Sequence, residues 1–226
     1  MDGDWTGVLN GRTELEVELL TITPQAEALI ERAGRTCYLS FEKAGPGSAG
    51  RFCRMLLRRG HESVFEHATA TFRVIGGSRA FTHQLVRHRL CSFSQQSQRY
   101  VEEGGFGSVT PPSIAGEEEA RRIFAEHLAD CEARYRALRG LGVPKEDARF
   151  VLPNAATSEI VVSANLRQWR TVLKLRGHPT AQWEIRRFAV AVYRELVEHV
   201  PNVFADLSVT TAGDGLEPVD PRGGGK

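Results

Sequence analysis

The stretch ATATFRVIGGSRAFTHQLVRHR, residues 68–89, predicts a strand followed directly by a helix. Apolar and polar residues alternate from Ala68 to Val74, which is the pattern of a half-buried strand. The Gly76–Gly77 pair is expected to end this strand, and Ser78 is a suitable N-cap for a helix over residues 79–89. This helix would carry the basic sequence RHR at its C-terminal end.

The same two periodicities continue on both sides of this stretch. Leu15, Val17 and Leu19 alternate with glutamates, which predicts another strand, and Thr23 and Pro24 are favourable cap and first-turn residues for a helix. The remaining predicted elements are helices over residues 24–38, 49–60 (with Gly60 as a left-handed C-cap), 116–138, 144–152, 166–177 and 181–200, and a strand over 156–165. Helices with a few long strands between them predict an α+β fold.

The composition is that of a globular protein without a strong overall charge. Of the 226 residues, 41% are hydrophobic and 25% are charged, and 29 Lys and Arg residues stand against 28 Asp and Glu residues. The formal net charge of +1 gives no general attraction to nucleic acid or to an anionic membrane, so any anion site must be local. No apolar run approaches the roughly 20 residues of a membrane-spanning helix.

The chain contains no Pro-, Gly- or Ser-rich segment that would separate two domains, and no internal repeat. We therefore expect one domain over residues 14–212, preceded by a loose leader over 1–13 and followed by a flexible tail over 213–226. The leader lacks the basic start and the apolar stretch of a secretory signal, so a cytoplasmic location is expected.

Neither the cysteines nor the histidines form a metal pattern. The four cysteines are widely separated and include no C-x-x-C pair, which also argues against a disulfide framework. HESVFEH, residues 61–67, begins like the helix of a zinc protease, but Phe65 stands where the second histidine ligand is required. No metal site is expected.

Residues 87–100, RHRLCSFSQQSQRY, concentrate cations, hydroxyls and amides in one short segment. Arginine binds phosphate through paired hydrogen bonds, and hydroxyls and amides can complete the coordination of a phosphate or of a heterocycle edge. The segment therefore predicts an anion or nucleotide site. The alternative is that Arg87, His88 and Arg89 only cap the carbonyl groups at a helix end, and that a solvated polar loop follows.

The same segment resembles the signature of a known enzyme family. RHRLCSFSQQS fits the pattern R-H-R, seven residues, S of the flavin-dependent thymidylate synthases, and QRY extends it as in many members. GHESVFEHATATF before it, and ARFVLPN and NLRQWRTVLKLRGHPTAQWEIRRFA after it, are similar to further blocks of that family. These blocks cover most of residues 35–210. The resemblance implies the fold of the family, a mostly antiparallel sheet flanked by helices in a single domain.

What this resemblance implies is an enzyme that makes dTMP from dUMP. Methylenetetrahydrofolate would donate the one-carbon unit, and NADPH would supply reducing equivalents through bound FAD. Members of the family are homotetramers whose sites draw residues from more than one subunit, and they need no cysteine nucleophile. Because the sequence contains no Rossmann fingerprint, NADPH would bind without a dedicated domain.

The resemblance also implies two sets of site residues. The expected flavin contacts are His61, Ser63, Arg87, His88, Arg89, Gln95, Asn165 and Arg167. The expected dUMP contacts are Gln84, Arg87, Gln95, Gln96, Ser97, Gln98, Arg99, Arg149 and Arg176. Gln96 departs from the family pattern, since leucine is frequent there, and so does Thr171, where some members place an asparagine that contacts the flavin.

Arg176 is the residue expected to act in catalysis. Attaching a methylene group at C5 of uracil requires electron density at that carbon, and a guanidinium beside N3 favours the ionised ring. A permanently cationic group stabilises this anion but cannot remove the proton. Arg99 and Arg149 are expected to bind the phosphate, each charge-assisted hydrogen bond contributing on the order of 1.5 to 3 kcal/mol. Ser97 is expected to hydrogen-bond, because an unactivated serine is no nucleophile.

Two alternatives stay open from the sequence. The charges of Arg87 and Arg89 would favour a Cys91 thiolate, and a cysteine nucleophile could drive uracil methylation without flavin. Cys91 could equally be a small buried residue. A nucleic-acid-binding module could use the arginine-bearing helix ends, although the near-neutral charge and the lack of a basic stripe with aromatics disfavour it.

Overall fold

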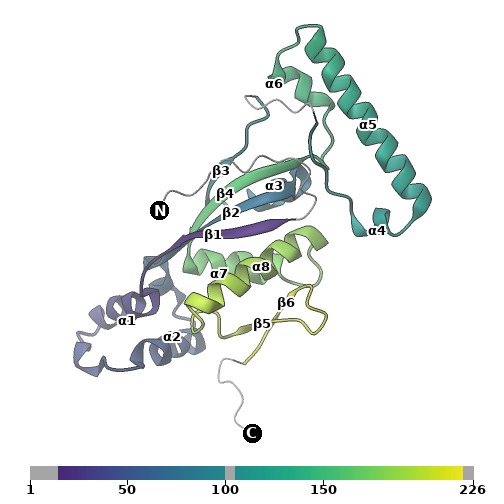
Figure 1. Cartoon of the computed structure of the whole chain (residues 1–226). Coiled ribbons are helices and arrows are strands. Elements are labelled where there is room, and N and C mark those ends of the chain that lie inside the picture. The colour runs from purple at the N-terminus through teal and green to yellow at the C-terminus, as the bar shows by residue number, and fades with distance from the viewer. Residues whose placement is uncertain (1–14, 100–104, 221–226) are drawn as a thin grey trace. The chain divides into compact units, whose positions relative to one another are not determined.

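The computed structural model describes residues 15–99 and 105–220 as a mixture of helices and antiparallel strands (Figure 1), in agreement with the predicted fold class. Its α-helices are α1 (Ala26–Thr36), α2 (Ser48–Arg59), α3 (Arg79–Leu85), α4 (Pro112–Ala115), α5 (Glu118–Gly140), α6 (Lys145–Ala148), α7 (Leu166–Arg176) and α8 (Trp183–His199). The strands are β1 (Glu16–Ile22), β2 (Thr69–Ser78), β3 (Ser92–Gln95), β4 (Thr157–Asn165), β5 (Leu207–Val209) and β6 (Leu216–Pro218), and short 3-10 helices are η1 (Phe41–Lys43), η2 (Glu62–His67) and η3 (Arg149–Val151). No helix in the described part of the chain is long and apolar enough to cross a membrane.

The chain forms two compact units. The α5 unit holds Val74–Gln84 and Ser94–Ile160, whereas the α7 unit holds Val17–Arg73, Leu85–Phe93 and the chain from Val161 onward. Strands β2 and β4 each continue from one unit into the other, so the chain has no linker at the division. The expected leader over residues 1–13 lies outside the described residues.

Each unit contains part of a four-stranded sheet with the order β1-β2-β4-β3. In the α7 unit the Thr71 hydroxyl lies 2.8 Å from the Ser163 hydroxyl, between β2 and β4. In the α5 unit the Arg79 N–H donates to the Ala156 carbonyl at 2.9 Å, beside the same two strands. Higher numbers at the end of β2 thus pair with lower numbers on β4, which makes this pair antiparallel.

The core of the α7 unit is built around Trp169 on α7, whose side chain is fully buried. Its ring meets Phe72 of β2 edge-on at a centroid distance of 5.1 Å and Phe188 of α8 at 6.4 Å. The indole N–H donates to the Ala70 carbonyl at 3.0 Å, so no polar atom of the ring is left unpaired. These contacts pack α7 against strand β2 and thereby position the residues at the two ends of α7.

The α5 unit is dominated by the long helix α5, with α4 near its start and α6 near its end (Figure 1). The Glu117 side chain accepts hydrogen bonds from the N–H groups of Glu119 and Ala120, which is an N-cap of the kind that the acidic start predicts. Cys131 and Tyr135 form its buried stripe, as the periodicity predicts. Exposed ion pairs on this helix join side chains one turn apart.

Two predicted boundaries in this region are wrong. Thr23 does not cap α1, because it bonds Thr69 of β2: the Thr23 N–H donates to the Thr69 carbonyl and the Thr69 N–H to the Thr23 hydroxyl, both at 2.9 Å. The Gly76–Gly77 pair does not end β2, which continues to Ser78. Gly76 adopts a left-handed φ of 77°, and Gly77 leaves room for the Phe81 ring, which would lie 2.6 Å from a Cβ there.

Other local predictions are confirmed. Gly60 ends α2 in the left-handed conformation with φ 67°, as a glycine C-cap should. The Ser78 hydroxyl accepts the Phe81 N–H at 3.0 Å and so caps α3. Residues 213–220, part of the tail that the sequence predicts, include strand β6, which pairs antiparallel with β5.

Candidate active site

The RHR sequence lies in a tight turn that follows α3, and not on the helix itself. Helix α3 ends at Leu85, and the His88 N–H donates to the Leu85 carbonyl at 3.1 Å. The predicted helix over residues 79–89 is therefore too long, because three-residue turns replace the helical four-residue spacing. As a result the Arg87 and Arg89 side chains are exposed, while His88 is buried.

His88 and Arg176 form the central contact of the site. Arg176 is the last residue of α7, and its Nε donates to Nε2 of His88 at 2.9 Å. Burial, reinforced by the charge of Arg176, lowers the pKa of His88 to about 4. The imidazole is thus neutral near pH 7 and accepts a hydrogen bond at Nε2. Burial and the charge of Arg87 lower the pKa of Arg176, which nevertheless remains a cation.

A cleft of about 590 Å³ opens beside this contact, entirely within the α7 unit. The residues that line it are Val86, Arg87, His88, Arg89, Leu175 and Arg176. Three guanidinium groups around one neutral imidazole make a strongly cationic wall, and Val86 and Leu175 add apolar surface. Such a wall is suited to an anionic ligand with a flat ring.

The other expected flavin residues of the α7 unit do not line this cleft. His61 precedes η2, and the Asn165 side chain accepts the Gln168 N–H at 2.8 Å as the N-cap of α7. Arg167, in the first turn of α7, forms an ion pair with Glu66 of η2. The Ser63 side chain is exposed and makes no hydrogen bond with another described residue. Gln95, also expected at the flavin, belongs to the α5 unit.

A second polar pocket, of about 270 Å³, lies within the α5 unit. The residues that line it are Arg79, His83, Gln98, Arg149, Phe150, Leu152, Pro153 and Asn154. Gln98 and Arg149 were expected at dUMP, whereas Arg79 and His83 were missed. Their spacing of four residues places both on one face of α3, and a search for basic residues at helical spacing would have found them.

Most of the other expected dUMP residues belong to the same unit. Arg99 forms an ion pair with Glu146 at 2.9 Å, and the Ser97 hydroxyl accepts the Arg99 N–H at 3.2 Å. The Gln95 amide donates to the Thr82 and Ser158 hydroxyls at 3.0 and 3.1 Å. Gln84, on α3, is also part of this unit.

Gln96 has an unusual environment. Its backbone N–H donates to the Glu159 carbonyl at 2.8 Å, next to strand β4. Its side-chain Oε1 is buried and has no hydrogen-bond partner among the described residues. A buried acceptor without a donor costs free energy in the folded protein.

Cys91 is not in the environment that its nucleophile role requires. The thiol is partly buried, and burial raises its pKa, although a hydrogen bond with the Gln168 side chain opposes the shift. The expectation that Arg87 and Arg89 favour a thiolate is therefore wrong, because burial dominates the shift and neither guanidinium group contributes to it. This removes the physical basis for the alternative in which Cys91 attacks uracil.

The chain is similar over most of its length to a known protein family. The family described as "Thymidylate synthase complementing protein" matches residues 18–202. A flavin-dependent thymidylate synthase of Geobacter sulfurreducens is 44% identical over an alignment of 200 residues, which covers 85% of this chain and 86% of that protein. The chain belongs to the flavin-dependent thymidylate synthase family.

Two further proteins are similar to this member of the flavin-dependent thymidylate synthase family. A protein of the same description from Mycobacterium marinum is 41% identical over 219 residues, covering 89% of this chain and 88% of the relative. Thymidylate synthase X from Helicobacter pylori, solved with FAD and dUMP, superposes with a TM-score of 0.72 over 84% of this chain and 97% of that one. At 23% identity this last likeness shows a shared fold.

The family match contains every residue of the two expected sets, since they all lie between His61 and Arg176. It ends at residue 202, before strands β5 and β6. The two sets divide between the units: most flavin residues and Arg176 are in the α7 unit, and most dUMP residues are in the α5 unit.

Proposed function

We propose that the chain is an FAD-dependent thymidylate synthase that converts dUMP to dTMP, with methylenetetrahydrofolate as one-carbon donor and NADPH as reductant. One observation carries this proposal: Arg176 donates to the neutral imidazole of His88, in a cleft that two more arginines line. Because the acceptor is neutral, the hydrogen bond fixes the position of the Arg176 cation and leaves its charge uncompensated. A group that stabilises a developing anion needs both a fixed position and a full charge.

The donor set of the cleft fits FAD. The Arg87 and Arg89 side chains are exposed, and neither side chain makes a hydrogen bond or an ion pair with another described residue. Two guanidinium groups so placed match a pyrophosphate, and the apolar side chains of Val86 and Leu175 match a flat ring system. We therefore assign Arg87, His88 and Arg89 to FAD, together with His61, Ser63, Gln95, Asn165 and Arg167. When bound, FAD supplies the hydride chemistry that a protein side chain lacks.

We assign Arg176 to the uracil ring. Its Nε is used by His88, which sets the plane of the guanidinium, and the Nη groups would contact the N3 and carbonyl edge. The cation stabilises negative charge as the ring becomes nucleophilic at C5. His88 stays neutral at working pH, so it orients Arg176 and does not repel it.

The pocket of the α5 unit is our candidate for the dUMP phosphate. Arg149 lines it, with its Nε held by the Glu146 carbonyl at 3.0 Å, and Arg79 adds a second guanidinium. Arg99 pairs with Glu146 on the surface, where an ion pair contributes about 0 to 1 kcal/mol and can yield to a phosphate. We place Gln84, Gln95, Gln96, Ser97 and Gln98 at the nucleoside, with Ser97 as a hydrogen-bonding group.

Self-association as a homotetramer belongs to the same proposal. Leu90 follows the RHR sequence and is 81% exposed, and Phe150 lines the phosphate pocket and is 82% exposed. Large apolar side chains beside polar sites are typical of surfaces that a partner covers. A second copy of the chain would bury them and complete each site with residues of the other unit.

An absorption spectrum of the purified protein tests the proposal. We expect a yellow protein whose flavin bands bleach with NADPH, and dTMP formation when dUMP and methylenetetrahydrofolate are added. Arg176→Ala should keep the flavin and lose most dTMP formation, and Arg176→Lys should not restore it, because an ammonium lacks the planar fork. Arg59→Ala is the matched control, since Arg59 is exposed in the last turn of α2. A colourless protein that binds DNA with a steep salt dependence would refute the proposal.

A further inference from the structure

The C-terminal hairpin, which we define as Asp206–Val219, lies beyond the part of the chain that the family match covers. Strands β5 and β6 pair from Leu207 with Pro218 to Val209 with Leu216. The Val219 N–H donates to the Asp206 carbonyl at 2.9 Å and closes the hairpin, and the Tyr193 hydroxyl donates to the Leu207 carbonyl at 2.6 Å. The hairpin is thus a defined structure, attached to α8.

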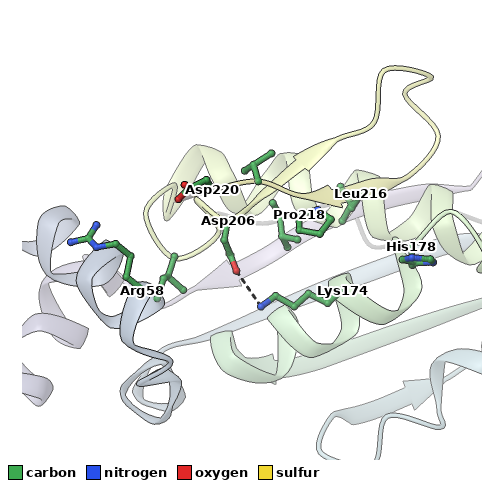
Figure 2. Close-up of a pocket in the computed structure, with 10 residues that line it drawn as sticks. Arg58, Lys174, His178, Asp206, Leu216, Pro218 and Asp220 are labelled. Carbon is green, nitrogen blue, oxygen red and sulfur yellow. Dashed lines mark ion pairs between the residues drawn. The ribbon is translucent and has the colours of Figure 1, made fainter. Parts of the chain in front are cut away.

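Asp206 ties the base of the hairpin to α7. Its two carboxylate oxygens accept hydrogen bonds from Arg170 at 2.6 and 2.7 Å, and Lys174 lies 3.1 Å away. Figure 2 shows this Lys174–Asp206 pair in a cavity of about 820 Å³, with Leu216 and Pro218 of the hairpin along one side. Arg170, which is 1% exposed, also donates to Glu62 at 2.9 Å. Glu62 stands between His61 and Ser63, so the same guanidinium holds the segment of the expected flavin contacts.

The tip of the hairpin reaches the end of α7. The Leu216 N–H donates to the Gly177 carbonyl at 2.7 Å, and Gly177 follows Arg176 directly. A Cβ on Gly177 would lie 2.7 Å from both the Leu216 side chain and the Leu173 carbonyl, so this contact requires glycine. The backbone of Gly177 is otherwise ordinary, with φ −80°, and the requirement comes from the close approach alone.

We propose that the C-terminal hairpin is a positioning element for Arg176. Docking of Leu216 on Gly177 fixes the last turn of α7, and with it the direction of the Arg176 side chain toward His88. The Asp206–Arg170–Glu62 chain of contacts holds the other end of the hairpin and the His61–Ser63 segment against the same helix. The catalytic meaning of this arrangement rests on the proposed function, whereas the placement of Arg176 does not.

Two substitutions disturb the contact between Gly177 and Leu216, one at each of the two residues. Gly177→Ala adds a Cβ where the Leu216 side chain lies, and Leu216→Ala removes that side chain from the hairpin. Gly45→Ala is the matched control, because a Cβ on Gly45 would meet no atom within 4 Å. Amide hydrogen exchange at Leu216 reports whether the hairpin is docked, and NMR titration of His88, assigned with His88→Gln, reports whether Arg176 is in place.

In both variants we expect faster exchange at Leu216. We also expect the His88 pKa to rise from about 4, because burial still lowers it but the charge of Arg176, the lesser cause, moves away. For the enzyme we expect kcat to fall at least tenfold with flavin content unchanged. If Leu216 loses protection while the His88 titration and kcat stay as in Gly45→Ala, the proposal is overturned. A parent protein that makes no dTMP refutes the proposed function, yet the titration still tests the positioning. Should Gly177→Ala fail to fold, Leu216→Ala alone decides.

Discussion

Replacing Asp206 with asparagine removes one charge from the buried network around Arg170 without changing the size of the side chain. The guanidinium has four hydrogen bonds: one to the Val203 carbonyl, one to Glu62 and two to Asp206. Its Nε already has no partner among the described residues, so an acceptor lost at Asp206 leaves a further buried N–H group of this guanidinium unpaired. An asparagine offers one acceptor oxygen, and its NH₂ group would face a guanidinium N–H.

The magnitude follows from burial. Removing one partner of a buried ion pair costs about 3 to 5 kcal/mol, because the other charge is left without compensation. Arg170 is 1% exposed and Asp206 is 18% exposed, which places the pair in this regime. Glu62 remains as a counter-charge at 2.9 Å, so we expect the lower end, a loss of about 3 kcal/mol in the free energy of unfolding at pH 7.

The pH dependence supplies an independent check. Burial alone would raise the pKa of Asp206, but the hydrogen bond and the charge of Arg170 outweigh it and hold the pKa below its ordinary value. A depressed carboxylate pKa gives stability that is present above the unfolded pKa and is lost as pH falls through the folded pKa. The difference between the parent and Asp206→Asn should therefore be largest near pH 7 and should shrink below about pH 4.

Urea unfolding followed by tryptophan fluorescence measures this difference, at one fixed concentration of chain so that self-association contributes equally. Asp214→Asn is the control: Asp214 lies in the same hairpin and pairs with Arg186 at 3.3 Å, but it is 53% exposed. A surface pair of this kind contributes about 0 to 1 kcal/mol. If Asp206→Asn is no more than about 0.5 kcal/mol less stable than Asp214→Asn at pH 7, the buried network does not stabilise the fold as argued.

Three further predictions follow from the site. Cys91→Ala should keep dTMP formation within about twofold, because burial raises the thiol pKa, and a flavin-loaded variant without turnover would contradict this. Because the His88 pKa is lowered to about 4, the unfolded chain binds a proton at His88 between pH 6.5 and about 4, whereas the folded chain does not. The free energy of unfolding of the parent should therefore decrease by on the order of 3 kcal/mol as the pH falls through this range. His88→Gln should lack that slope in urea titrations, and parallel curves for the two proteins would be evidence against a neutral buried imidazole. Arg149→Ala should raise the KM for dUMP about tenfold or more relative to Arg134→Ala, an exposed arginine of α5, whereas an unchanged KM would remove Arg149 from the phosphate site.

Local signals in the sequence are sufficient for most elements of the fold. Gly60 ends α2 because only a residue without a Cβ adopts the left-handed conformation cheaply, and this depends on no distant contact. The alternation in β4 and the apolar stripe of α5 likewise record which face is buried. The candidate site residues were found by a resemblance that covers the RHR sequence and its neighbouring blocks, and no local pattern assigns them individual roles.

The features that orient the site residues and set their charge come from contacts between residues that are far apart in the sequence. Helix α3 ends at Leu85, before the RHR turn, and Arg170 is buried against Asp206 and Glu62. Leu216 docks on Gly177. The neighbouring sequence predicts none of these three features. The lowered pKa of His88 depends on Arg176, 88 positions further along the chain. The sequence alone determines periodicity, caps and charge, because these act within a few residues. Only the tertiary structure decides burial and pairing of charges, because a dielectric environment and a close approach are set by segments that meet through folding.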